Sequence, residues 1–203
     1  MISVRILLAL AVAVLVSGTA AAQEEIDKAK AAAFDKRLFV GPLAPTITYA
    51  CFVRAYDSEH LAKHPKQKVS GMKLLVTVEH PPDDKVNYSF RLGVKYRHRA
   101  GNFDSSGSCN HFIPEDAGDE IRLGCGVDCD GGGLSVAVAK DDKSAIIRLE
   151  RVRIWQNNKP DDEAEHELVA GADDKIFRLD RTDNKECASL VTDRKVLAAL
   201  RRK

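Results

Sequence analysis

The stretch G-M-K-L-L-V-T-V-E-H-P-P-D-D-K-V-N-Y-S-F-R-L-G-V-K-Y-R, residues 71–97, decides the fold class of this chain. Apolar and polar side chains alternate on both sides of a turn at 80–84. This period is typical of antiparallel strands that have one face in a core and the other face in water. The stretch therefore predicts a β-hairpin. Its inward-facing residues are Met72, Leu74, Val76 and Val78 on the first strand and Val86, Tyr88, Phe90, Leu92, Val94 and Tyr96 on the second.

Further short strands are predicted on both sides of this hairpin. They cover residues 47–55, 102–112, 121–129, 134–139, 144–155, 168–170 and 176–180. Between Leu149 and Val152 the alternation slips, which predicts a β-bulge. About eight strands joined by hairpin turns, with short helices at the two ends of the chain, predict an all-β protein. We expect an antiparallel meandering barrel, with a sandwich as the alternative.

The ends of the chain differ in character from this β domain, which we expect to cover 45–190. Residues 1–22 have one early basic residue, an apolar run and small residues ending in Ala20-Ala21-Ala22, the pattern of a signal peptide. The apolar run is too short to span a membrane. Residues 23–44 predict a loosely docked helix and a linker, and 191–203 a basic C-terminal helix. We expect a periplasmic or secreted monomer that begins at Gln23 and has no transmembrane segment.

The charge balance bears on the class of partner. The chain of 203 residues has 31 basic and 30 acidic side chains, and the predicted signal peptide contains one of the basic ones. A nucleic-acid-binding protein is expected to carry a basic excess on one face. The even balance therefore argues against nucleic acid as a partner.

Five cysteines lie in the predicted mature chain, and in an oxidising compartment they are candidates for disulfides. In a hairpin centred on Ala117, Cys109 faces Cys125, and opposed Cα atoms about 4.5 Å apart suit a disulfide. A second pair, Cys51–Cys187, would tie the first strand to the end of the last one. Cys129 would then be a free thiol.

A metal site formed by Cys125, Cys129 and His111 is disfavoured by strand length. These side chains share one face of the predicted strands, but at 3.3 Å per residue the two cysteines stand about 13 Å apart. One zinc ion cannot bridge that distance.

The other metal candidates also have simpler interpretations. Asp128 and Asp130 resemble the start of a calcium loop whose remaining ligands are missing, so we expect a glycine-rich turn. His60 and His64 have helical i, i+4 spacing, but Leu61 stands where a zinc protease needs glutamate. We expect two solvent-facing histidines on a short helix at 57–65. The sequence predicts no catalytic set and no cofactor.

Two stretches carry a resemblance to other proteins: Y-D-S-E-H-L-A-K-H-P-K-Q at 56–67, and S-G-S-C at 106–109 followed by C-G-V-D-C-D-G-G-G at 125–133. Together they resemble an uncharacterised group of exported proteins from alpha-proteobacteria with no known activity. The resemblance covers most of residues 49–187. It implies a periplasmic location and a shared cysteine-bearing hairpin, and it implies no catalytic residues.

These observations favour a non-enzymatic binding module for a small ligand or an envelope partner, with its site in the barrel or in the loops at one end. One alternative is a thiol- or metal-dependent activity centred on Cys129 and His111. Another is a structural envelope protein whose basic tail, residues 201–203, contacts anionic surfaces.

Overall fold

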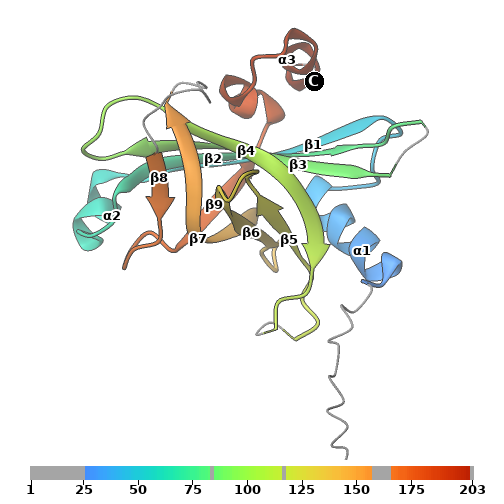
Figure 1. Ribbon diagram of the computed structural model, residues 1–203, viewed down its shortest axis with the longest axis horizontal. Helices are drawn as coiled ribbons and strands as arrows, with labels where there is room; N and C mark the ends of the chain where they lie inside the picture. Colours follow the sequence, from blue (N-terminus) through green and yellow to red (C-terminus); the bar gives the residue numbers. More distant parts are fainter. Residues whose placement is uncertain (1–25, 83–84, 116–117, 157–165, 202–203) are drawn as a thin grey trace, which may run out of the picture.

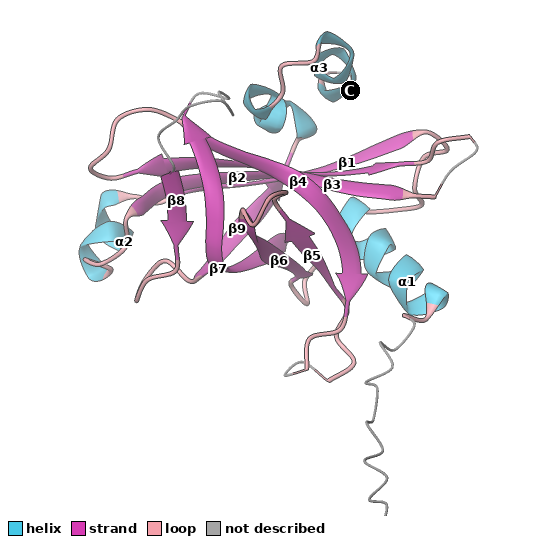
Figure 2. Cartoon of the chain, viewed as in Figure 1, coloured by secondary structure: helices cyan, strands magenta, loops and turns pink. Residues whose placement is uncertain are grey.

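The computed structural model describes residues 26–82, 85–115, 118–156 and 166–201. These residues form nine strands and four short helices (Figures 1 and 2). In chain order the elements are α1 (Lys28–Phe39), β1 (Ile47–Ala55), α2 (Ser58–Lys63), β2 (Val69–Glu79), β3 (Asn87–Tyr96), β4 (Phe103–Phe112), β5 (Arg122–Gly126), β6 (Gly132–Val138), β7 (Ser144–Gln156), β8 (His166–Val169), β9 (Ile176–Thr182), the 3₁₀ helix η1 (Asn184–Leu190) and α3 (Arg194–Leu200).

The strands close into an antiparallel barrel. From β1 to β7 each strand pairs with the next one along the chain, so this part is a meander. The ring closes because β9 pairs with both β7 and β1. Eight strands thus form the ring. The ninth strand, β8, pairs with β7 and is not part of the ring. The predicted all-β meandering barrel is confirmed.

The long strand β7 shapes one side of the barrel. One of its edges pairs with β6, while its other edge pairs with β9 in its first half and with β8 in its second half. Leu134 faces Leu149 while Gly133 faces Arg151, so Glu150 is an extra residue in β7. The bulge predicted between Leu149 and Val152 is confirmed. At the end of β7, Trp155 faces Asp104 of β4.

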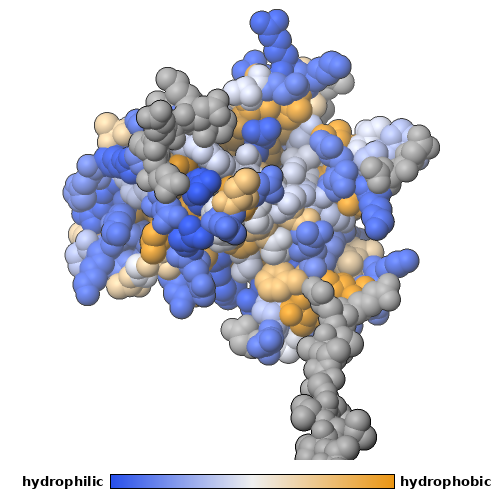
Figure 3. Space-filling model, in the orientation of Figure 1, coloured by the Kyte–Doolittle hydropathy of each residue, from blue (hydrophilic) through white to orange (hydrophobic). Residues whose placement is uncertain are grey.

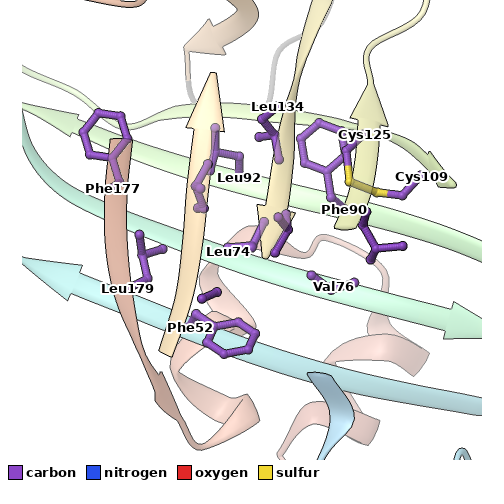
Figure 4. Close-up of a cluster of buried hydrophobic side chains, with 14 of the residues drawn as sticks. Phe52, Leu74, Val76, Phe90, Leu92, Cys109, Cys125, Leu134, Phe177 and Leu179 are labelled. Carbon is purple, nitrogen blue, oxygen red and sulfur yellow. A yellow bond between two sulfur atoms is a disulfide. The ribbon is translucent and has the colours of Figure 1, made fainter. Parts of the chain in front are cut away.

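Large apolar side chains fill the interior (Figure 4). Phe52, Phe90, Phe103 and Phe177 are each at most 1 % exposed and come from four different strands. An eight-stranded barrel is only just wide enough for the side chains that point inward. The strands therefore enclose a packed core, and the Cys109–Cys125 disulfide lies within it beside Phe90.

Helix α1 packs against the barrel more firmly than the sequence predicted. Phe34, Leu38 and Phe39 are buried in the same core as the strands. The guanidinium of Arg181 on β9 donates to the carbonyl oxygens of Leu38 and Arg37, near the end of the helix. The prediction of a loose helix was wrong because it ended the helix at Arg37. The structure extends it to Phe39 and adds a second apolar turn.

The outer face of β1 and β2 carries a second hydrophobic cluster. Cys51 and Leu75 point outward there and are buried beneath Cys187, Leu190 and Leu200. In Figure 3 hydrophobic residues gather beneath α3, whose own outer surface is hydrophilic. One face of the sheet was predicted to be wet, but at these strands η1 and α3 cover it. The sequence analysis did not predict η1.

Candidate functional site

The cysteines occupy three different environments. Cys109 and Cys125 face each other across β4 and β5 and form a disulfide, with their Cα atoms 4.0 Å apart. Cys51 of β1 and Cys187 of η1 form the second, with a Cα separation of 5.9 Å. These are the two pairs expected from the sequence. Cys129 is a free, exposed thiol.

Cys129 lies in a turn, not in a strand. The predicted strand 121–129 ends at Gly126, because Val127 donates a backbone hydrogen bond to Gly132 and the chain reverses there. Cys129 and Asp130 both have positive φ angles, and Asp128 and Asp130 are exposed. This is the turn that the glycine-rich sequence predicted.

His111 does not meet Cys129. It faces Leu123 near the start of β5, whereas Cys129 lies beyond the end of that strand. From Leu123 to Gly126 the strand advances about 10 Å. Within the described residues, no three His, Cys, Asp or Glu side chains are grouped to hold a metal ion.

His111 instead belongs to a buried polar cluster that fastens α1 to the barrel. Asp35 of α1 accepts one hydrogen bond from His111 Nε2 at 2.9 Å and another from the Tyr88 hydroxyl at 2.6 Å. The side chains of His111 and Asp35 are 12 % and 7 % exposed. Phe34 and Tyr88 both pack edge-on against the imidazole ring.

The electrostatics of this cluster favour a neutral tyrosine. Burial, together with the hydrogen bond to the Asp35 carboxylate and its charge, raises the pKa of Tyr88 well above its usual value. An ionised carboxylate can only accept hydrogen bonds, so His111 Nε2 carries the proton and donates it in the hydrogen bond to Asp35. Asp35 is thus held by two donors, and the cluster acts as a structural anchor for α1.

His60 and His64 stack on each other. Their ring centroids are 4.4 Å apart at 27° between planes, and Tyr56 stacks on the other side of His60. A metal ion binds in the plane of an imidazole, along a nitrogen lone pair. In stacked rings the nitrogen lone pairs of the two histidines do not converge on one point, so His60 and His64 are not arranged to bind one metal ion together. Both histidines were predicted to face solvent, and both are half-buried in the structure, with 45 % of the His64 side chain exposed.

A groove on the outer face of the barrel is the most promising site for a ligand. Its floor carries little side-chain bulk, because Ala55, Gly71 and Gly93 occupy outward positions on β1, β2 and β3. A Cβ atom added to Gly71 would meet only the Arg54 carbonyl oxygen at 3.5 Å and the Lys95 Cβ at 3.8 Å. The hollow above these residues measures about 510 Å³, within the usual range for sites that take small molecules.

The C-terminal segment forms one wall of this groove. Leu190 lies directly over Gly93, since an added Cβ there would be 2.5 Å from its Cδ2 atom. Lys73 and Lys95 lie on the same outward rows as the two glycines. Lys73 donates to the carbonyl oxygen of Glu186 and to the Ser189 hydroxyl. Among the described residues, the Lys95 ammonium makes no hydrogen bond or ion pair, and only the backbone carbonyl of Lys95 accepts one from the Ser70 hydroxyl.

A smaller hollow of about 230 Å³ adjoins the groove on the other side of Leu190. Arg91, Ser106, Trp155 and Thr192 line it, and Asp104 and Leu190 line both hollows. Trp155 is the only tryptophan in the chain. The two hollows together cross the outer surface of β2, β3 and β4 as far as the end of β7.

This groove is not among the sites predicted from the sequence. The residues predicted to face inward leave Gly71 and Gly93 on the other face of the hairpin, as the structure shows, but the alternation alone does not indicate a groove there. A glycine inside a strand often marks a close approach by a ligand or another backbone. The two glycines lie close together because of the pairing of β2 with β3, which the hairpin pattern predicts. The wall of the groove depends instead on the tertiary contact between Leu190 and Gly93, which strand pairing does not predict.

The protein is thus a closed antiparallel β-barrel with an N-terminal helix anchored to it and a hollow on its outer face. Comparisons with protein-family models, curated proteins and solved structures found no match for the chain. None of the described helices is both long enough and apolar enough to cross a membrane.

Proposed function

We propose that this chain is an exported, non-enzymatic binding protein whose ligand lies in the groove floored by Gly71 and Gly93. The observation that carries the proposal is the contrast between the two faces of the sheet. Side chains pack the interior, whereas the outer face has a hollow of about 510 Å³ over strand positions that carry at most a methyl group. The site is thus outside the barrel rather than in its mouth.

Two features support export. Both disulfides link buried cysteines, and disulfides persist in oxidising compartments. Residues 1–22, which lie outside the described residues, carry the signal-peptide pattern. Expression in a Gram-negative host followed by mass spectrometry of the periplasmic fraction tests this part. The expected species begins at Gln23, and a full-length chain retained in the cytoplasm would contradict it.

Binding is tested by filling the groove. Gly71→Phe places a ring in the hollow without a close contact at its Cβ, because the nearest atoms there are at ordinary van der Waals distances. Gly126→Phe is the matched control: Gly126 lies on β5, outside the lining of either hollow, and an added Cβ meets nothing within 4 Å.

The wild type and both variants are screened by thermal shift against metabolites, lipids and peptides. We expect ligands that stabilise the wild type and Gly126→Phe but not Gly71→Phe. Stabilisation of all three proteins by the same ligands would place binding elsewhere, and the groove would no longer be the site.

A further inference from the structure

The charges around the groove indicate what kind of ligand it takes. We propose that the groove binds an amphiphilic anion, a single molecule with a hydrocarbon body and one carboxylate head group, and that Lys73 and Lys95 recognise the head group. This inference rests on the proposed function, because it assigns a ligand class to the same groove.

The floor and one wall suit a hydrocarbon. Val53, Ala55 and Leu190 present apolar atoms to the hollow, and the two glycines add no polar side chain. A hydrocarbon that covers these atoms removes apolar surface from water, which is favourable without any directional contact. The outward sheet face has its backbone groups paired in the strand ladders, so it offers few hydrogen bonds to a polar ligand.

The positive charge at the groove is not compensated among the described contacts. The partners of Lys73 are a carbonyl and a hydroxyl oxygen, which carry no net charge. The Lys95 ammonium has no hydrogen-bonding or ionic partner within the described residues. Arg54 differs, because its guanidinium is 2.8 Å from the Asp180 carboxylate. Two ammonium groups are therefore available to an anion.

The charges also orient the ligand. Asp104 lies beside Leu190, at the boundary between the two hollows. Lys95 lies one row further out, on the row of Gly71. A carboxylate is attracted by Lys95, and a lysine can lay its apolar stem along a hydrocarbon while its ammonium stays in water. The head group thus lies toward Lys95 and the tail toward Leu190.

Trp155 provides a signal for this binding. It is the only tryptophan, and it lines the hollow on the far side of Leu190. The test titrates the mature protein with three amphiphiles of the same chain length, each below its micelle concentration: decanoate, decyl maltoside and decyltrimethylammonium. Tryptophan fluorescence and isothermal titration calorimetry report the affinities.

Decanoate is expected to bind about 1.4-fold to fivefold more tightly than the other two, the range that an exposed ion pair provides. Lys95→Met should remove most of this preference and leave the affinity for decyl maltoside unchanged, because it removes the charge and keeps a stem of similar length. Lys140→Met, an exposed lysine in the turn between β6 and β7, is the control and should have no effect.

The outcomes separate the ligand class from the site. Equal affinity for all three amphiphiles, lost in Gly71→Phe, would overturn the anionic assignment and leave the groove as the binding site. Decanoate binding that survives in Gly71→Phe would overturn the groove itself. Failure to bind free decanoate, even with binding to phosphatidylglycerol vesicles, would also overturn this inference, since a membrane surface would then be the partner.

Discussion

Two glycines with the same outward orientation have opposite tolerance for a side chain. A methyl group at Gly93 would collide with Leu190, whereas one at Gly71 would make ordinary contacts. We expect Gly93→Ala to lower the free energy of unfolding by about 1–3 kcal/mol, the usual cost of overpacking. Gly71→Ala should instead raise it by up to about 1 kcal/mol, because the unfolded chain loses freedom. Urea denaturation of both variants measures the difference.

If Gly93→Ala proved as stable as the wild type, Leu190 would have to move away at no cost. The fluorescence of Trp155 would then report the change, since Leu190 and Trp155 line the same hollow. An unchanged stability with an unchanged spectrum would contradict the close contact at Gly93.

Asp35 shows how much one buried carboxylate contributes. Its removal in Asp35→Ala leaves the Tyr88 hydroxyl and His111 without their acceptor, and we expect a loss of about 2–4 kcal/mol. Tyr88→Phe should cost about 1–2 kcal/mol. The double variant should lose less than the sum, because both changes break the same hydrogen bond.

Chemical denaturation of the three variants checks these values. Lys36→Ala, at the exposed neighbouring position of α1, is the control and should stay within about 0.5 kcal/mol of the wild type. Full additivity of the two single changes would show that Tyr88 and Asp35 act independently.

At the scale of elements, the Cys51–Cys187 disulfide holds the C-terminal segment on the barrel. It joins residues 136 positions apart, so it strongly restricts the unfolded chain. We expect the double variant Cys51→Ala, Cys187→Ala to lose about 2–4 kcal/mol of stability. The emission of Trp155 should also shift, because the wall from η1 is no longer fastened.

Cys109→Ala with Cys125→Ala serves as the comparison. This bridge closes a separation of 16 residues, so the chain-entropy part of its effect is smaller by roughly 1–2 kcal/mol. A spectral shift of the same size in this variant would contradict a specific role of the other disulfide in holding η1.

The strands could be predicted because their alternation is local. The hairpin of β2 and β3, the bulge in β7 and the register of Cys109 with Cys125 all follow from neighbouring residues. Asp57 and Pro65 likewise bounded the short helix α2. In contrast, the closure of the ring depends on the pairing of β9 with β1, which are far apart in sequence. The alternation of apolar and polar residues within one strand does not indicate which distant strand it pairs with.

The polar cluster and the groove could not be predicted for the same reason. Asp35 meets His111 from 76 positions away, and on the sequence it is one charge in a charged helix. Leu190 reaches Gly93 from a helix that the apolar pattern did not reveal. Gly71 and Gly93 can be recognised in the sequence, and their position on the same outward face of the hairpin was the one feature that could have indicated a site.

At the scale of the molecule, all four tyrosines bear on the stability at high pH. Burial is the largest cause that raises the pKa of Tyr49, Tyr56, Tyr88 and Tyr96, that of Tyr96 to about 12. In the unfolded chain tyrosine ionises near pH 10. The stabilising contribution is therefore complete below about pH 10 and is lost as the pH rises through the higher pKa values of the folded state.

We expect the free energy of unfolding to decline steadily above about pH 10. Tyrosine absorbance should therefore rise at a higher pH in the folded protein than in the unfolded chain, with Tyr88 and Tyr96 the last to ionise. Tyr96→Phe should make the decline less steep. Ionisation of every tyrosine near pH 10 in the folded protein would contradict the effect of burial.

The seam between β1 and β9 has a consequence for how the chain folds. Cys51 faces Thr182 there, so the ring closes through a contact between residues more than a hundred positions apart. Such distant contacts form late, because the loop entropy must be lost first. The β4–β5 hairpin with its own disulfide can form while β1 still has an open edge. During synthesis, Cys51 must therefore wait for almost the whole chain before its partner Cys187 exists, and from residue 129 onward Cys129 is a competing thiol.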